Sequence, residues 1–137
     1  MENKQSIQEL TEENYVELAE KVIMELKKED PIKRKIPQQI TTSKIRGLLS
    51  SISDIYNDVM VGDAQDLTGK LQYLKVQFVY ESGREKVTKN FVEKANILNY
   101  LNRINRENRL DDKKKIFLIF EKYMEALVAY HKYYGGE

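Results

Sequence analysis

The chain has 137 residues, of which 41% are hydrophobic and 33% charged, and its net charge at pH 7 is +1. This length and composition are typical of a single helical domain with an ionic surface, and the absence of cysteine excludes disulfides and thiolate metal sites. No apolar run approaches the roughly 20 residues of a membrane span, and the acidic start is unlike a signal peptide. We therefore expect no membrane partner and a cytoplasmic location.

The first part of the chain combines an acidic segment with a basic linker. Of 22 acidic residues in the chain, nine lie in residues 1–30, together with only four lysines, so the remainder is basic. Thr11 can cap a helix that runs to about Glu29, and the two prolines then bracket the stretch "PIKRKIP". The sequence predicts residues 1–38 as an acidic helical arm with a basic linker, and residues 39–137 as a helical domain.

The stretch "QQITTSKIRGLLSSI" predicts a helix that begins near Thr41 and runs to about Met60. Lys44 and Arg46 lie in its first turn, where the positive end of the helix dipole disfavours cations. Free N–H groups and hydroxyls at a helix start form an anion site, so these two cations could contact a phosphate. The alternative is that both side chains extend into water.

The third predicted helix begins at Asp66, as a possible cap, and runs to about Ser82. Its core, "LQYLKVQFVY", is rich in aromatic and β-branched residues, which a strand would also accept. Length and the three- and four-residue spacing of its leucines favour a helix, with Gly83 as the C-terminal stop.

Two further helices complete the predicted fold. One spans about Lys86 to Ile104, and the last begins at Asp111 or Asp112 as its cap and ends at about Tyr134. Five helices without a convincing strand predict an all-α protein, a compact bundle of about five helices.

Catalytic patterns are absent from the sequence. The single histidine, His131, has no nucleophile or acid partner in a recognisable signature, and we expect it to be a packing or surface residue. Asp54 and Asp58 share a helix face, but no set of residues offers several metal ligands at helical spacing, and no glycine-rich phosphate loop is present. The sequence predicts that the protein is not an enzyme and uses no cofactor or metal.

Basic residues gather in two further places. Lys70, Gln77 and Arg84 are spaced by seven residues and so share a helix face, with Lys75 on the polar side of that helix and Lys86 at the start of the next. Phosphate contact and a solvated face with pairs such as Glu81–Arg84 both fit this group. The third cluster comprises Arg103, Arg106 and Arg109. A role in solubility and a role in phosphate contact fit it equally. Tyr130, Tyr133 and Tyr134 could stack on bases, although such spacing more often indicates core or a subunit contact.

Three blocks in order, "TTSKIRGLL", "LQYLKVQFVYESGREK" and "YMEALVAYHKYY", resemble the small subunit of the type III-A CRISPR–Cas effector, the Csm complex. The resemblance covers about residues 39–134. It implies a helical bundle without an active site, several copies of which stack head to tail along the guide RNA and its paired target RNA. It also implies contacts with the backbone and large subunits of the complex, in antiviral defence.

By block position and charge, this resemblance assigns RNA contacts to Lys44, Arg46, Lys75, Arg84 and Lys86. A basic face of this kind would meet phosphates rather than base edges. On this hypothesis Lys44 and Arg46 have RNA as their counter-charge, and replacing both by alanine weakens RNA association without harming folding.

Two rival interpretations remain at this point. One is a stand-alone helical adaptor that binds only proteins and has a solvated basic face. The other is a helix-turn-helix DNA binder, although the loops predicted here are long for that motif.

Overall fold

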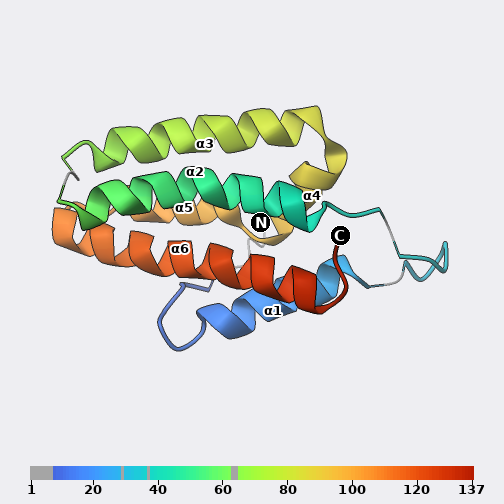
Figure 1. The fold of residues 1–137 in the computed structure, drawn as a ribbon. Helices are drawn as coiled ribbons and strands as arrows, with labels where there is room; N and C mark the ends of the chain where they lie inside the picture. The colour runs from blue at the N-terminus through green and yellow to red at the C-terminus, as the bar shows by residue number, and fades with distance from the viewer. Residues whose placement is uncertain (1–7, 29, 37, 63–64) are drawn as a thin grey trace, which may run out of the picture.

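The computed structural model describes residues 8–28, 30–36, 38–62 and 65–137, and within them it is all-α, as the sequence predicts (Figure 1). No strand occurs in these ranges; the one β-type pairing is an isolated bridge between Asp30 and Lys35. Glu29 and Pro37, which end the predicted first helix and the linker, lie outside the described residues. The helices are α1 (Tyr15–Leu26), α2 (Thr42–Met60), α3 (Leu67–Arg84), α4 (Lys86–Lys94), α5 (Ile97–Asn105) and α6 (Leu110–Tyr133).

The long helix α6 lies against α1, α2 and α5, and α3 forms an outer layer over α2, α4 and α5 (Figure 1). Large apolar side chains recur at three- and four-residue steps along the buried face of α6. These side chains are no more than 1% exposed: Phe117, Phe120, Tyr123, Met124 and Leu127. They form the centre of a single hydrophobic cluster to which all six described helices contribute.

The acidic arm packs into this same cluster through α1. Thr11 and Asn14 exchange hydrogen bonds between side chain and backbone, 2.8 and 3.2 Å long, so Thr11 caps the turn that leads into the helix. Regular helix begins at Tyr15, and the buried side chains Ala19 and Ile23 lie in the core beside α6.

The ambiguous third segment is a helix, but Gly83 does not end it. The helix α3 continues through Gly83 to Arg84, and the extended backbone of Glu85, at φ −138° and ψ 129°, separates it from α4. Asp66 occupies the N-cap position without a side-chain cap hydrogen bond. The predicted stop at Gly83 was therefore wrong, because the change of direction comes from Glu85.

The predicted helix from Lys86 to Ile104 is two helices, which raises the count in the described chain from about five to six. Asn96 adopts a left-handed conformation at φ 57°, a region that asparagine tolerates better than most residues, and this ends α4. The Tyr123 hydroxyl donates a buried 2.8 Å hydrogen bond to the carbonyl of Ala95, one of the carbonyls left free where α4 ends. The break is thus held from α6.

The start of α6 also differs from the prediction. Arg109, in extended conformation, occupies the N-cap position, and neither Asp111 nor Asp112 is the cap. Both acids instead lie in the first helical turn, where the helix dipole favours negative charge.

A buried carboxyl lies between α6 and α2. Glu121 is 4% exposed, and burial raises its pKa to about 7, with the hydrogen-bonded Glu125 adding to the shift. A hydrogen bond from Ser53 on α2 and the nearby Lys122 act in the opposite direction. The pKa of Glu121 in the folded protein is higher than the 4.5 of the same carboxyl in the unfolded chain. Its contribution to the free energy of folding is therefore fully present below about pH 4.5 and is lost as the pH rises through about 7.

We expect Glu121→Gln, which mimics the protonated carboxyl, to stabilise the fold at pH 8 by about 1–2 kcal/mol and to have a smaller effect at pH 5. Urea unfolding of both proteins at the two pH values measures this difference. The control is Glu93→Gln, which changes an exposed carboxyl on α4. Equal stability changes at both pH values would show that Glu121 is not held protonated by its surroundings.

Candidate nucleic-acid interface

The start of α2 is built as the sequence predicts. Thr41 has an extended backbone, and its hydroxyl accepts a 3.1 Å hydrogen bond from the Lys44 N–H, so it is the N-cap. The next residue, Thr42, is buried and lies 2.6 Å from Nδ1 of His131 near the end of α6. His131 is 1% exposed, and burial lowers its pKa, so this histidine is a neutral packing residue that fixes the start of α2.

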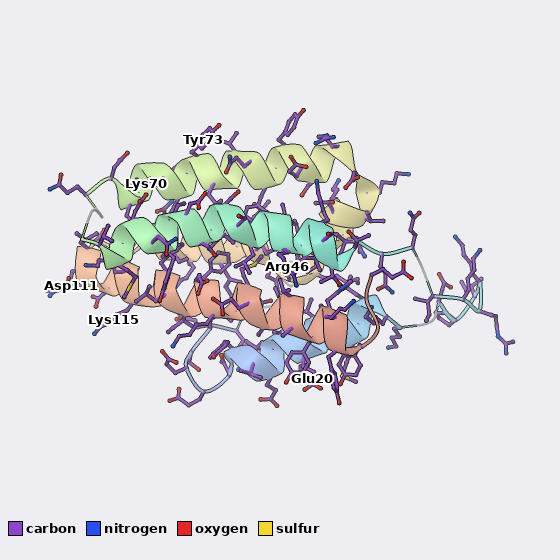
Figure 2. All side chains as sticks on the ribbon, viewed as in Figure 1. Glu20, Arg46, Lys70, Tyr73, Asp111 and Lys115 are labelled. Carbon is purple, nitrogen blue, oxygen red and sulfur yellow. The ribbon has the colours of Figure 1, made fainter. Side chains whose placement is uncertain are left out.

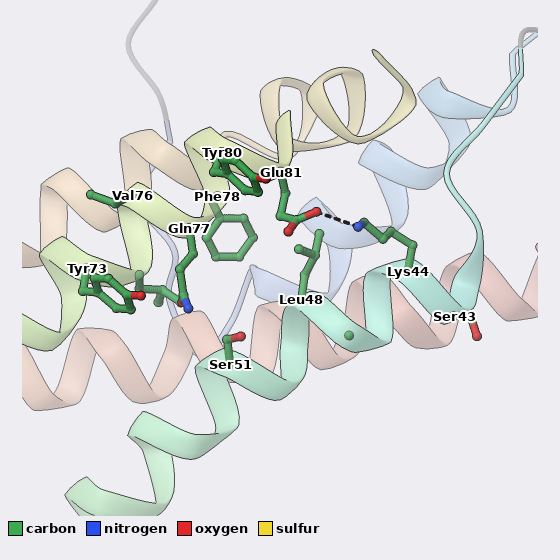
Figure 3. A pocket seen from close by; sticks show the side chains of 12 residues that line it. Ser43, Lys44, Leu48, Ser51, Tyr73, Val76, Gln77, Phe78, Tyr80 and Glu81 are labelled. Atoms are coloured by element: carbon green, nitrogen blue, oxygen red, sulfur yellow. Dashed lines mark hydrogen bonds and ion pairs between the residues drawn. The ribbon is translucent and has the colours of Figure 1, made fainter. Parts of the chain in front are cut away.

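Lys44 has its counter-charge inside the protein. Its ammonium lies 2.7 Å from Oε1 of Glu81 on α3 and 3.9 Å from a carboxylate oxygen of Glu85 (Figure 3). The Lys44 and Glu81 side chains are 30% and 25% exposed, so the pair is half-buried between α2 and α3. The hypothesis that Lys44 has no partner in the isolated chain was wrong, because the fold places the end of α3 beside the start of α2.

Glu81 joins two of the predicted RNA-contact residues. Its carboxylate also lies 3.4 Å from Nη1 of Arg84, which confirms the Glu81–Arg84 pair considered from the sequence. The hydrogen bond from Lys44 holds the pKa of Glu81 below its usual range, so the carboxylate stays ionised. The Arg84 guanidinium lies 5.8 Å from the centre of the Tyr80 ring, within the range of a cation–π contact.

Arg46 and Lys86 complete a cationic end, by which we mean Lys44, Arg46, Arg84 and Lys86. Both side chains are exposed and form no ion pair with any other described residue. The start of α2 and the junction of α3 with α4 lie at the same end of the bundle (Figure 1). Arg46 is far from Lys115, which lies near the opposite end with Asp111 (Figure 2).

Lys75 is not part of the cationic end. It precedes Arg84 by nine residues, or about 13 Å along the helix axis, and its ammonium donates a 2.9 Å hydrogen bond to Asn102 on α5. The structure thus joins Lys44 and Arg84 through Glu81, places the exposed Arg46 and Lys86 at the same end of the bundle, and leaves Lys75 bonded between two helices.

The other basic residues considered from the sequence are largely engaged within the fold. Lys70 pairs with Asp58 at 3.1 Å, and Arg103 pairs with Glu107 at 2.7 Å and with Glu9 at 3.2 Å. Arg109 lies 3.6 Å from Asp112, while Arg106 is exposed. Most of these side chains therefore form ion pairs within the protein, which agrees with the alternative of a solvated, ion-paired face.

The tyrosines at the end of α6 contact one another. Tyr133 and Tyr134 have ring centres 5.0 Å apart, and Tyr130 lies 6.3 Å from both. The Tyr134 hydroxyl donates a 2.6 Å hydrogen bond to Glu20 on α1, which raises the pKa of Tyr134 to about 12. This cluster fastens α6 to the arm and leaves Tyr133 exposed at 76%.

The cationic end adjoins a feature that the sequence analysis missed, a groove between α2 and α3 (Figure 3). Tyr73 and Tyr80 lie along it and are 64% and 63% exposed. The available signal was the outer face of the third helix, which carries glycine, tyrosine, valine and glutamine but hardly any charge, unlike a typical solvated helix face.

Within the described chain, no group of three His, Asp or Glu side chains is placed to hold a metal ion. A search of the same residues for a helix long and apolar enough to cross a membrane found none.

Comparison with known proteins places the chain in a family. The family model described as Csm2 Type III-A matches residues 9–137, which includes most of the arm. The protein named "CRISPR system Cms protein Csm2" from Streptococcus thermophilus is 43% identical over 128 residues, which cover 93% of this chain and 97% of that protein. A protein of the same name from Enterococcus italicus is 43% identical over 99 residues, which cover 69% of this chain and 68% of that protein. Another from Mycobacterium tuberculosis is 38% identical over 105 residues, which cover 74% of this chain and 80% of that protein.

The chain belongs to the Csm2 type III-A family.

The predicted resemblance to the small subunit of the Csm complex is thereby confirmed. As a Csm2 family member, the chain is a non-catalytic subunit of a type III-A CRISPR system and is not an enzyme. It forms part of a complex with other Csm subunits, so the stand-alone adaptor and the helix-turn-helix DNA binder are both set aside.

We expect Lys44→Ala to lower the Tm of this Csm2 family protein by about 1–4 °C, because it removes a half-buried contact between α2 and α3. Arg46→Ala, a matched loss of one charge from the same helix turn, should leave the Tm unchanged. Thermal unfolding followed by circular dichroism measures both. An unchanged Tm for Lys44→Ala would mean that the pair with Glu81 adds nothing to stability.

Proposed function

We propose that this Csm2 family chain stacks in several copies along the guide RNA–target RNA duplex and contacts RNA phosphates to stabilise target binding in antiviral defence. Its partners are the guide and target RNA, the backbone and large subunits of the Csm complex and other copies of itself, in the cytoplasm. The observation that carries the proposal is the cationic end, where the start of α2 and the junction of α3 with α4 lie at the same end of the bundle although they are far apart in the sequence.

The unpaired members of the cationic end are the best candidates for phosphate contacts. Arg46 and Lys86 are exposed and have no acidic partner in the described structure, so RNA phosphates would face little competition for them. Arg84 is 55% exposed and shares Glu81 with Lys44. Lys44 and Lys75 would contact phosphate while keeping, or exchanging, the partners they already have.

Arm and body differ in charge in a way that supports head-to-tail stacking. The arm is acidic and its helix α1 packs on α6, whereas the cationic end belongs to α2, α3 and α4. Two unlike surfaces on one subunit favour a heterologous contact, which repeats in one direction along a filament.

Affinity for single-stranded RNA measured across salt concentrations tests the phosphate contacts. With about three contacts for each subunit, the logarithm of affinity should fall with the logarithm of salt at a slope near −2, or about twenty-fold between 50 and 200 mM. Arg46→Ala combined with Lys86→Ala should flatten the slope by about 1.4, because each phosphate contact accounts for about 0.7. Fluorescence anisotropy of a labelled oligouridine provides the measurement.

The matched control for this experiment is Arg109→Ala with Lys115→Ala. It removes the same charge at the start of α6, where Figure 2 places Lys115 near the opposite end of the bundle from Arg46. An equal change in slope from both pairs would show that net charge, and not the cationic end, determines RNA affinity. Absence of wild-type binding at low salt would contradict RNA contact altogether.

Recovery of the tagged chain from its native cell tests the assembly. At moderate salt we expect it to bring down short RNAs of uniform length together with the other Csm subunits. Identification of the bound RNA by sequencing, and of the proteins by mass spectrometry, decides the result. A chain that brings down the other subunits without RNA would leave the complex intact but contradict the RNA-contact role.

A further inference from the structure

The groove between α2 and α3 has a volume of about 540 Å³, large enough for a planar heterocycle and part of its sugar. Its floor is formed where Leu48 and Phe78 meet, and its far end is closed by the Lys44–Glu81 pair (Figure 3). Gly47 on α2 has no side chain to narrow the groove, and no atom lies within 4 Å of the position that its Cβ would take.

Two exposed tyrosines form the outer wall. Tyr73 and Tyr80 are seven residues apart and so lie on one face of α3, about 10 Å apart along the axis, with the 59%-exposed Val76 between them. Together with Val76 and Val79 they form a run of exposed apolar side chains along α3, and contiguous apolar patches of this kind mark interaction sites. Because every nucleobase has an aromatic face, rings in this position suit stacking with an unpaired base.

Two polar side chains line the groove, the exposed Gln77 and the half-buried Ser51. Gln77 extends across it between the two tyrosines, and Ser51 faces it from α2 (Figure 3). Neither side chain forms a hydrogen bond with another described residue, and Gln77 offers both a donor and an acceptor. These groups can bond the edge of a base, which an apolar helix face from a protein partner would leave unsatisfied.

The groove opens beside the cationic end. The Arg84 guanidinium already lies over the outer ring of Tyr80, 5.8 Å from its centre, and the Lys44 ammonium borders the same end of the groove. A base seated between the tyrosines would therefore place its phosphate near Arg84 and Lys44, where it would compete with the Glu81 carboxylate for both cations. Charge thus distinguishes this surface from a purely apolar docking face.

We propose that the groove between α2 and α3 binds an unstacked nucleobase of RNA, stacked against Tyr73 or Tyr80 and bonded at its edge by Gln77 or Ser51. This inference rests on the proposed function, since it requires the chain to contact RNA. It adds base contact to the phosphate contact made by the cationic end.

The test compares two probes of equal length, an oligouridine and an abasic ribose-phosphate oligomer that carries the same charge without bases. Wild-type protein should bind oligouridine more tightly, and Tyr73→Ala with Tyr80→Ala should remove that preference with a loss of at least about five-fold in oligouridine affinity. The salt slope should be unchanged, because no charge is altered. Val79→Ala, which alters an exposed side chain of α3 that does not line the groove, is the control and should bind as wild type does.

A second variant reports stacking directly. The chain contains no tryptophan, so Tyr80→Trp introduces a single tryptophan, whose fluorescence reports on the groove. Its fluorescence should be quenched by oligouridine and much less by the abasic oligomer. Circular dichroism of each variant verifies that α3 stays helical.

The possible outcomes distinguish failure of base binding in the groove from failure of RNA contact as a whole. Equal wild-type affinity for both probes would overturn the inference while leaving phosphate contact intact. Normal RNA binding by the double variant, with loss of self-association or of Csm subunits, would identify the groove as a protein interface and also overturn it. Wild-type protein that binds neither probe would contradict the proposed function, and the inference with it.

Discussion

Burial of one face of α6 is the interaction on which the rest of the structure depends. The aromatic and aliphatic side chains from Phe117 to Leu127 on this face are almost completely buried, and α1, α2 and α5 pack around them. Because these neighbours surround α6, α3 packs instead on α2, α4 and α5 in an outer layer (Figure 1). Its inward stripe is buried, and its outward face remains open. The stability of the fold and the availability of that surface therefore have the same origin.

The packing of α3 on α2 also determines which charges meet at the start of α2. A cation in the first turn of a helix opposes the helix dipole, and α2 has no acid in its first turn to compensate. The packing of α3 across α2 brings Glu81 to Lys44, so the compensation comes from another helix. Glu81 also lies 3.4 Å from Arg84, and Glu85 lies 3.9 Å from Lys44, so two carboxylates balance these two cations. The excess of positive charge at this end comes from Arg46 and Lys86, which form no ion pair with a described acid.

Most of the helices are encoded locally, whereas contacts between distant segments are not. The start of the second helix near Thr41 and the helical nature of the third segment could be predicted from short-range spacing, because capping groups and an apolar stripe decide them. Helix ends are less certain even though they are local, since Glu85 ends α3 in place of Gly83 and Arg109 is the N-cap of α6 in place of Asp111 or Asp112. The break at Asn96 was missed because the apolar spacing continues on both sides of it. The left-handed backbone of Asn96 and the hydrogen bond from Tyr123 to Ala95 together accompany the change of direction.

The same distinction applies to the candidate site. Lys44 and Glu81 are 37 residues apart, and the local pattern of neither segment predicts that the two helices pack side by side. The sequence therefore indicated the right end of each helix but assigned Lys44 no internal partner and placed Lys75 with the others. The groove was missed for a related reason, since neither α2 nor α3 contains it alone. Its tyrosines had a local signal, in the uncharged outer face of α3, whereas its floor and polar groups required the fold.

Several polar groups in the interior of the bundle hold helices together. His131 bonds Thr42, Tyr123 bonds Ala95, and the buried Glu121 lies against Ser53 and Glu125. At the surface, the groove and the cationic end share Glu81 at their border. Stacking on tyrosine and attraction of phosphate both tolerate any base. A surface built in this way suits a subunit that supports an RNA whose sequence is selected elsewhere, by base pairing between guide and target.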